Sequence, residues 1–257
     1  MSTLTFAMRD SSTMIRRQLK RLLRYPSMTV QLIVTPVILL LLFVYVLGGT
    51  LGAGLGGGRD AYVNYVVPGI LLMAAATAAT GTAVMVATDM TEGIIARFRT
   101  MRISRASVLT GHVVGSVVQQ LLGMAVLIGI ALAIGFRPTA GAAEWLAAIG
   151  ILTLFVVAVT WLAVALGLRS PTPEAASNAP MPLILLPFLG SGFVPTDSMP
   201  TVLRWFAEYQ PFTPIMETVR GLLLGTPIGN SGAIATAWCA GIAALSYLWA
   251  KKTFNKA

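Results

Sequence analysis

The sequence predicts an all-α integral membrane protein with six transmembrane helices, and three observations support this prediction. First, the 257 residues are 56% hydrophobic and only 11% charged, whereas soluble domains carry about 25% charged residues. Second, the stretches 61–88 and 106–136 contain no Asp, Glu, Lys or Arg, and a helix needs about 20 mostly apolar residues to cross a bilayer. Third, the basic residues gather in short segments between such stretches, which is the pattern that orients membrane helices.

Six spans place both termini on one side of the membrane, and the charge distribution predicts that this side is the cytoplasm. With the two ends, 89–105 and 169–174 inside, fourteen of the eighteen Lys and Arg residues are cytoplasmic. Cytoplasmic loops of membrane proteins carry such an excess. We therefore expect a single multi-pass domain in the cell's inner or plasma membrane. The expected spans are about 28–47, 62–87, 108–136, 145–168, 175–194 and 232–250.

The first expected element is an amphipathic helix over residues 11–24, which Pro26 ends. A helix of low hydrophobicity with a cationic face is typical of the membrane interface. Two roles remain open for this helix, an anchor that orients the first span and a surface that contacts a partner. Its basic residues are Arg16, Arg17, Lys20, Arg21 and Arg24.

The first span is followed by a glycine-rich segment, 48–58, in which seven of the eleven residues are glycine. A phosphate-binding loop requires a following Gly-Lys-Ser/Thr and a strand–loop–helix context, and the sequence offers neither here. We expect a flexible extracellular loop instead. We also expect that this chain binds no cofactor of its own.

The second span, 62–87, is expected to bend near Pro68 because proline removes a helix hydrogen bond. Its interior contains the small-residue run AAATAATGTA at 74–83. Small residues let helices approach closely in lipid. This run is expected to pack against another span or a second subunit, and alternatively to border a substrate path.

An arginine-rich segment, TEGIIARFRTMRISR at 91–105, separates the second and third spans. Its apolar residues recur at three- and four-residue spacing, which predicts a helix with one apolar stripe and one cationic face. A helix at the cytoplasmic surface is in a position to transmit a conformational change of a soluble partner to the transmembrane helices. The apolar stripe consists of Ile94, Ile95, Phe98 and Met101.

The only histidine and the only cysteine do not indicate a catalytic or metal site. His112 lies near the cytoplasmic end of the third span. An ionisable group in a membrane is a functional candidate, but at headgroup depth a hydrogen-bonded interfacial histidine is favoured over a proton-coupling role. Cys239 has no second cysteine to form a disulfide or a cysteine-based metal cluster.

The fifth span, 175–194, is rich in proline, and the longest outside region follows it. Within that region, 202–207 and 214–224 carry apolar residues at helical spacing. We expect two short helices that re-enter the outer leaflet, where irregular backbone is tolerated only against protein or a watery cavity. Glu217 and Arg220 are three residues apart on the second helix, and this spacing predicts an ion pair; two exposed loop charges are the alternative.

Two groups of residues resemble the ABC-2-type permeases. Glu92-Gly93 followed by Arg97-Phe98-Arg99-Thr100-Met101 is similar to the first cytoplasmic loop of that family, although Arg102 replaces a frequent proline. The second group resembles the carboxy-terminal signature of the family and consists of residues 191–195, 199–200, 210–214 and 217–222. The subgroup most similar in these motifs is the daunorubicin-resistance-type permeases of actinobacteria.

The resemblance implies a six-helix half-transporter that forms a homodimer, or pairs with a paralogue, and binds two ABC ATPase subunits. It implies that residues 11–24 are the connecting helix. ATP and Mg would then be bound by the partner, because this sequence has no Walker A motif. The residues implied to couple to the ATPase are Glu92, Gly93, Arg97, Phe98, Arg99, Met101 and Arg102, and those implied to form the re-entrant outer gate are Pro195, Pro211, Pro214, Glu217 and Arg220.

The function favoured by the sequence is ATP-driven export of amphipathic or hydrophobic compounds by alternating access, as in drug, antibiotic or lipid efflux. The spans contain few charges, each of which would cost about 2.5–3.5 kcal/mol at mid-membrane. Export of a glycan or polymer is the alternative. An intramembrane enzyme would need a catalytic dyad and a proton-coupled carrier would need buried carboxylates, so both are remote. Nucleic-acid binding is excluded because basic and aromatic residues are not interleaved.

Overall fold

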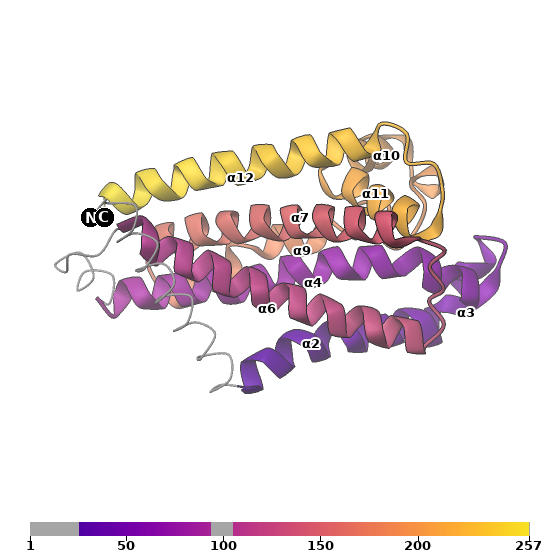
Figure 1. Cartoon of the computed structure of the whole chain (residues 1–257), viewed down its shortest axis with the longest axis horizontal. Helices are drawn as coiled ribbons and strands as arrows, with labels where there is room; N and C mark the ends of the chain where they lie inside the picture. Colours follow the sequence, from indigo (N-terminus) through magenta and orange to yellow (C-terminus); the bar gives the residue numbers. More distant parts are fainter. Residues whose placement is uncertain (1–25, 94–104, 257) are drawn as a thin grey trace.

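The computed structural model describes residues 26–93 and 105–256, and every regular element in these ranges is a helix. The long helices lie side by side in a bundle (Figure 1). The long elements are α2 (Pro26–Leu41) with its extension α3 (Gly48–Ala53), α4 (Gly58–Thr91), α6 (Arg105–Ala133), α7 (Ala142–Arg169) and α12 (Ser231–Lys256).

Five of the described helices are long and apolar enough to cross a membrane. They correspond to the first, second, third, fourth and last of the expected spans. An apolar helix of about 20 residues matches the thickness of the hydrocarbon core. Their bounds are Ile33–Ala53, Gly58–Thr91, Val113–Ala133, Ala142–Arg169 and Ser231–Phe254.

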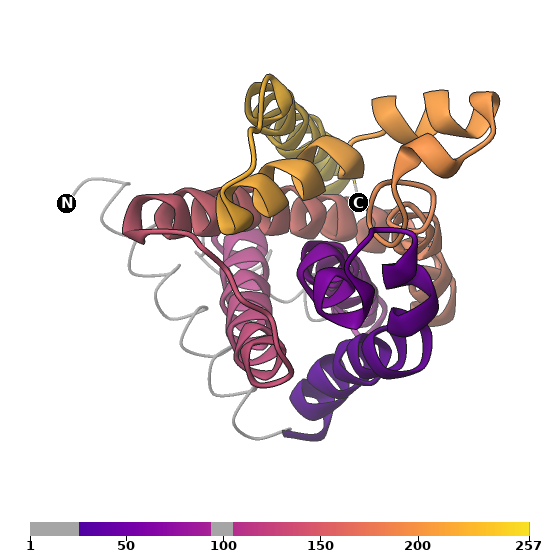
Figure 2. The same ribbon diagram turned by 90° about the vertical axis from the view of Figure 1, so that its right-hand side faces the viewer.

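Helix α4 lies in the middle of the bundle and packs against α2, α6, α7, α8 (Pro173–Asn178) and α11 (Phe212–Leu224). Figure 2 looks along the bundle from the end that carries α3, with α4 in purple among its neighbours. The small residues of 74–83 allow this packing, since Ala76, Ala79 and Ala83 are fully buried. At Gly167 of α7, an added Cβ would lie 2.5 Å from the carbonyl oxygen of Ala83.

The glycine-rich segment after the first span is more ordered than expected. The first span continues through a π-helical segment, Leu42–Leu47, into α3, so only 54–57 remain as turns. The reason is a close backbone approach: a Cβ at Gly52 would collide with the backbone of Gly58, at the start of α4. Glycine is required there for steric fit and not for flexibility.

The expected continuous helix over 175–194 is not formed. The chain there makes two short helices, α8 and α9 (Met181–Leu185), followed by turns. Proline provides no N–H and clashes with the preceding helical turn, so Pro180, Pro182 and Pro187 together break the helix.

This broken segment nevertheless runs antiparallel along α4. At one end, Ser177 lines the same cavity as Thr88, near the carboxyl end of α4. At the other end, the hydroxyl of Tyr62 donates to the carbonyl oxygen of Phe193 at 3.1 Å. Between them, a Cβ at Gly69 would lie 2.5 Å from the carbonyl oxygen of Gly192.

Two short helices follow, as predicted for 202–207 and 214–224. They are α10 (Thr201–Tyr209) and α11, and they lie at the end of the bundle where α12 begins (Figure 1). Pro211 occupies the amino-terminal cap of α11, and Gly225 ends that helix in the left-handed conformation. Glycine adopts this conformation without steric penalty.

Candidate functional site: a polar cavity and an arginine cluster

An arginine cluster lies where α4, α11 and the broken segment meet. Arg220 of α11 donates from Nη2 to the carbonyl oxygen of Ser191 at 2.6 Å and from Nε to that of Tyr65 at 3.2 Å. Its Cζ also lies 3.8 Å from the centroid of the Tyr65 ring. The Tyr65 hydroxyl completes the cluster by donating to the Ser191 carbonyl oxygen at 2.9 Å. We call these three residues the Arg220 cluster.

The ion pair expected between Glu217 and Arg220 is not formed between these two described residues. Arg220 binds backbone carbonyl groups and an aromatic face instead. Glu217 accepts a hydrogen bond from the Ser231 hydroxyl at 3.4 Å. Burial raises the pKa of Glu217, and the charge of Arg220 partly opposes this effect. The two charges therefore interact electrostatically without a hydrogen bond or ion pair between these two described residues.

Aromatic stacking and a glutamine reinforce this end of the bundle. The rings of Phe43, Phe188 and Phe193 form a cluster, in which Phe193 stacks on Phe43 and on Phe188 at centroid distances of 4.4 and 4.5 Å. Such contacts contribute about 0.5–1.5 kcal/mol each beyond burial. Buried Gln210 donates to the carbonyl oxygen of Leu186 at 3.2 Å. The irregular backbone after α9 is thus satisfied by protein groups, as a low-dielectric environment requires.

The opposite half of the bundle contains a cavity of about 650 Å³ between α2, α4, α6, α8 and α9. We call it the α4–α6 cavity. Its lining residues on α4 come from the carboxyl-terminal half of that helix, whereas Tyr65 lies near the amino end. The cavity and the Arg220 cluster are therefore separated along the bundle. The residues with hydroxyl groups on its wall are Thr35, Thr77, Thr80, Thr82, Thr88, Ser116 and Ser177.

The described residues that line the α4–α6 cavity have no ionisable side chain, and their polar groups are hydroxyls and amides. Two hydrogen bonds between helices order part of this wall. Thr82 Oγ1 donates to Ser116 Oγ at 3.1 Å, and Gln120 Nε2 donates to Thr160 Oγ1 at 3.0 Å. Such bonds hold membrane helices together with about 0.6 kcal/mol each on average.

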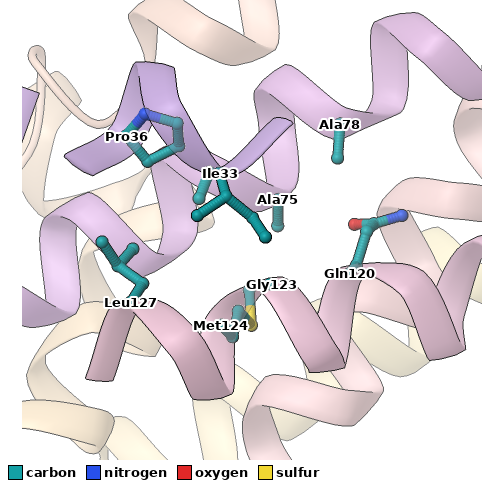
Figure 3. A pocket seen from close by; sticks show the side chains of 9 residues that line it. Ile33, Pro36, Ala75, Ala78, Gln120, Gly123, Met124 and Leu127 are labelled. Atoms are coloured by element: carbon teal, nitrogen blue, oxygen red, sulfur yellow. The ribbon is translucent and has the colours of Figure 1, made fainter. Parts of the chain in front are cut away.

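Two oxygen atoms on the cavity wall have no hydrogen-bond partner: Thr80 Oγ1 and Gln120 Oε1. Gln120 is only 4% exposed. Figure 3 shows its carboxamide projecting from α6 toward Ala78 of α4, at the edge of a small adjoining cavity of about 10 Å³. A buried polar group without a partner costs about 1–3 kcal/mol, and each of these two atoms has less than 1 Å² of exposed surface, so neither is open to the cavity.

Most of the residues implied to contact an ATPase lie outside the described ranges. Of the coupling set, Glu92 caps the carboxyl end of α4 and is exposed, and Gly93 has a φ of 69°. The side chain of His112, on α6, is also outside the described part. The undescribed set comprises Arg97, Phe98, Arg99, Met101 and Arg102 together with Arg16, Arg17, Lys20, Arg21 and Arg24.

Four of the five residues implied to form an outer gate lie on one helix, α11, or at its amino-terminal cap, and the fifth lies elsewhere. Pro211 and Pro214 lie at the start of α11, on the same helix as Glu217 and Arg220. Pro195 precedes a short 3₁₀ turn, Thr196–Ser198, ahead of α10. Tyr65 was not among the expected residues, and Ser191 was expected only as part of the carboxy-terminal signature 191–195, because neither has a local sequence pattern that points to an arginine.

Apolar spans, a broken proline-rich segment and two short helices before the last span define a multi-pass membrane transport domain. The sequence agrees with this description, since residues 10–224 match the ABC-2 type transporter family, and the chain belongs to that family. The resemblance inferred from the motifs is thereby confirmed.

Three curated relatives carry drug-resistance names. The chain is 27% identical over 204 residues to the daunorubicin resistance ABC transporter permease protein DrrB1 of Streptomyces coeruleorubidus, covering 79% of this chain and 70% of that protein. It is 24% identical over 184 residues to the probable doxorubicin resistance ABC transporter permease protein DrrC of Mycobacterium tuberculosis strains CDC 1551 / Oshkosh and H37Rv. That alignment covers 72% of this chain and 67% of each DrrC protein.

Proposed function

We propose that this chain is the permease subunit of an ATP-driven exporter that moves amphipathic or hydrophobic compounds out of the cell. The observation that carries the proposal is the similarity to permeases named for daunorubicin and doxorubicin resistance, over more than two thirds of the chain. Both names refer to small amphipathic drugs. A membrane cavity of drug size, free of ionisable groups among its described lining residues, supports the same substrate class.

The proposed mechanism is alternating access. The Arg220 cluster and the stacked rings around Phe193 close the bundle at the end where α11 lies. The α4–α6 cavity lies in the other half. This combination supports a state that receives cargo from the cytoplasmic side while the outer side is closed. Opening then requires that Arg220 leave the carbonyl groups it now binds.

The energy source in this proposal is a separate ABC ATPase subunit, which binds ATP and Mg. Residues 92–102 act as the coupling helix, residues 11–24 as the connecting helix, and two permease chains form the transport unit. The broken segment from α8 to Phe193 makes a sixth crossing, because it runs along α4 from Thr88 to Tyr62. Six crossings leave both termini in the cytoplasm, as the excess of basic residues there favours.

Transport in sealed inside-out vesicles tests the proposal. Vesicles that contain the permease and its ATPase are expected to accumulate doxorubicin in an ATP-dependent manner. Vesicles with the permease alone, or with an ATPase whose Walker A lysine is replaced by alanine, provide matched controls and are expected to accumulate none. ATP hydrolysis by the purified permease alone, or equal accumulation in all three preparations, would contradict the proposal.

A further inference from the structure

The carboxyl-terminal end of α12 has two faces of different character. Ala250 and Phe254 are buried, and they belong to one apolar cluster with residues of α7. The opposite face is open, since Leu245 and Leu248 are 70% and 58% exposed. Both leucines lie inside the span Ser231–Phe254, so in a membrane they face lipid hydrocarbon.

Along this open face the side chains change from apolar to aromatic to cationic. Lys252 comes four residues after Leu248 and seven after Leu245, so the three lie on one side of the helix. Trp249, which is 39% exposed, comes three residues before Lys252. Leu245 and Lys252 are about 10 Å apart along the helix axis, at 1.5 Å per residue. This distance reaches from the hydrocarbon into the headgroup layer, which is about 5–8 Å thick on each side of a bilayer.

We propose that this face binds an anionic phospholipid of the leaflet in which α12 ends, with an acyl chain along the two leucines and the phosphate at Lys251 and Lys252. Trp249 lies at the level of the ester carbonyls, to which its indole N–H can donate. Basic residues at the end of a transmembrane helix are typical of sites for anionic headgroups. The proposal goes beyond the transport function, because it holds whatever compound the permease moves.

The charge of this face favours an anionic headgroup over a zwitterionic one. Lys251 and Lys252 are exposed, and neither forms an ion pair with a residue that the structure describes. Arg169 ends α7 at the same end of the bundle (Figure 1) and is likewise exposed, so the local charge is strongly positive. A zwitterionic headgroup carries its own ammonium group, which these cations repel. Phosphatidylglycerol carries only the phosphate charge.

This arrangement is more specific than the orientation of the chain requires. Positive charge anywhere in the cytoplasmic segments orients the spans, whereas a lipid also needs apolar and aromatic groups on the same face as the charge. The packing of α12 on α7 fixes this face, since the ring of Tyr247 lies edge-on to that of Trp161 at a centroid distance of 4.9 Å. A soluble acidic partner fits less well, because Leu248 and Trp249 lie inside the span directly before the lysines.

Lipid retention by the purified permease tests the proposal. Delipidated permease is mixed with equal amounts of phosphatidylglycerol and phosphatidylcholine, and the lipids that stay bound are counted by native mass spectrometry. We expect the wild type to prefer phosphatidylglycerol by about tenfold or more, because each lysine near an anionic headgroup contributes about fivefold. Lys251→Gln/Lys252→Gln should retain the two lipids almost equally. Lys251→Arg/Lys252→Arg keeps both charges and should keep the preference.

The matched control removes two positive charges at the opposite end of the bundle. Arg59, at the start of α4, and Arg204 of α10 are both exposed. Arg59→Gln/Arg204→Gln therefore lowers the net charge by the same amount and should bind phosphatidylglycerol as the wild type does. An equal loss of preference in this control would show an effect of net charge alone and would overturn the site.

Three further outcomes would overturn the proposal. The first is equal retention of the two lipids by the wild type, or an unchanged preference in Lys251→Gln/Lys252→Gln. The second is displacement of phosphatidylglycerol by an equimolar amount of inorganic phosphate, which would assign the lysines to a soluble anion. The third is a lysine variant that keeps its lipid but loses the ATPase in a pull-down experiment, which would make this face a protein contact. The lipid measurements use neither ATP nor cargo, so their failure leaves the exporter function intact.

Discussion

The Cζ of Arg220 lies over the ring of Tyr65, 3.8 Å from the ring centroid, although the two residues are 155 positions apart in the sequence. The same guanidinium binds the carbonyl oxygen of Tyr65 and that of Ser191. One side chain thus joins α11, α4 and the broken segment. In a low-dielectric environment a cation so enclosed is stabilised by oriented carbonyl dipoles and by the aromatic face.

Replacing Arg220 by leucine should therefore lower stability. Two carbonyl groups lose a charged donor, and hydrogen bonds to charged groups contribute about 1.5–3 kcal/mol each. Because the carbonyls can recover part of this with water, we expect a net loss of about 2–4 kcal/mol. Thermal unfolding of the detergent-solubilised permease measures it.

Arg204→Leu is the matched control for this experiment. Arg204 of α10 is exposed and forms ion pairs with Asp197 and Glu208, each at 2.7 Å. Exposed ion pairs contribute little to stability, so this variant should unfold close to the wild-type temperature. Equal destabilisation by both substitutions would show that Arg220 acts only as a surface charge.

Exchanging the charges of Glu217 and Arg220 should not restore a functional protein. An ion pair would survive the exchange, but the contacts of Arg220 with two carbonyl oxygens would not, because a carboxylate cannot donate to them. We expect the double variant Glu217→Arg/Arg220→Glu to express no better than Arg220→Glu alone, and Glu217→Gln to be tolerated. Recovery in the double variant, measured by membrane expression level, would restore the ion-pair hypothesis.

The difference between the expected ion pair and the observed cluster shows which contacts of a residue the local sequence can predict and which it cannot. Spacing along a helix identifies Glu217 as a neighbour of Arg220, but the bonding partners lie on segments far away in sequence. Long charge-free runs predicted five long apolar helices that the structure contains, because hydropathy and length indicate which segments are able to cross a bilayer. The fifth segment was predicted as one helix because hydropathy does not report backbone continuity, although Pro180 and Pro182 were visible signals.

The α4–α6 cavity was only partly foreseeable. The small-residue run 74–83 left open whether it packs against another helix or borders a substrate path; the structure shows that it packs against neighbouring helices and also lines the cavity. Its alanines are buried against neighbouring helices, while Thr80 and Gly81 line the cavity. The polar pair Gln119-Gln120, inside an uncharged run, was the one sequence signal for the facing wall, but pairing between helices requires tertiary structure.

Gly69→Ala should be strongly destabilising. A Cβ at Gly69 would lie 2.5 Å from the carbonyl oxygen of Gly192, a backbone atom that cannot move aside alone. Overpacking of this kind costs about 1–3 kcal/mol. The control is Gly129→Ala on α6, where a Cβ meets nothing within 4 Å. There, alanine should stabilise the helix by about 0.5–1 kcal/mol, so thermal unfolding should shift in opposite directions for the two variants.

The orientation of the bundle can be measured by cysteine labelling of intact cells. Asp60→Cys, exposed at the start of α4, should react with a membrane-impermeant maleimide, and Lys252→Cys, exposed near the end of α12, should react only after permeabilisation. The native Cys239 is fully buried and leaves a low background. The excess of cytoplasmic Lys and Arg is the physical reason for this expectation. The reverse labelling pattern would invert the topology.

The last prediction concerns coupling to the ATPase through Phe98, which lies outside the described residues. The apolar stripe of 91–105 predicts that Phe98 inserts into a groove of the ATPase, and large apolar anchors dominate such interfaces. Phe98→Ala keeps every basic residue of the loop, so orientation in the membrane should be unchanged. Transport should be lost, with the ATPase released or its turnover no longer stimulated by doxorubicin.

The same substitution at Phe206 separates coupling from a general loss of an aromatic side chain. Phe206 is exposed on α10, at the opposite end of the bundle from the carboxyl terminus of α12 (Figure 1). Phe206→Ala should retain the ATPase in pull-down experiments and should retain doxorubicin transport. If Phe98→Ala transports equally well with its ATPase still bound, the arginine-rich segment serves only to anchor the chain at lipid headgroups. The contact that transmits ATP hydrolysis would then have to lie on another cytoplasmic segment, of which residues 11–24 are the next to test.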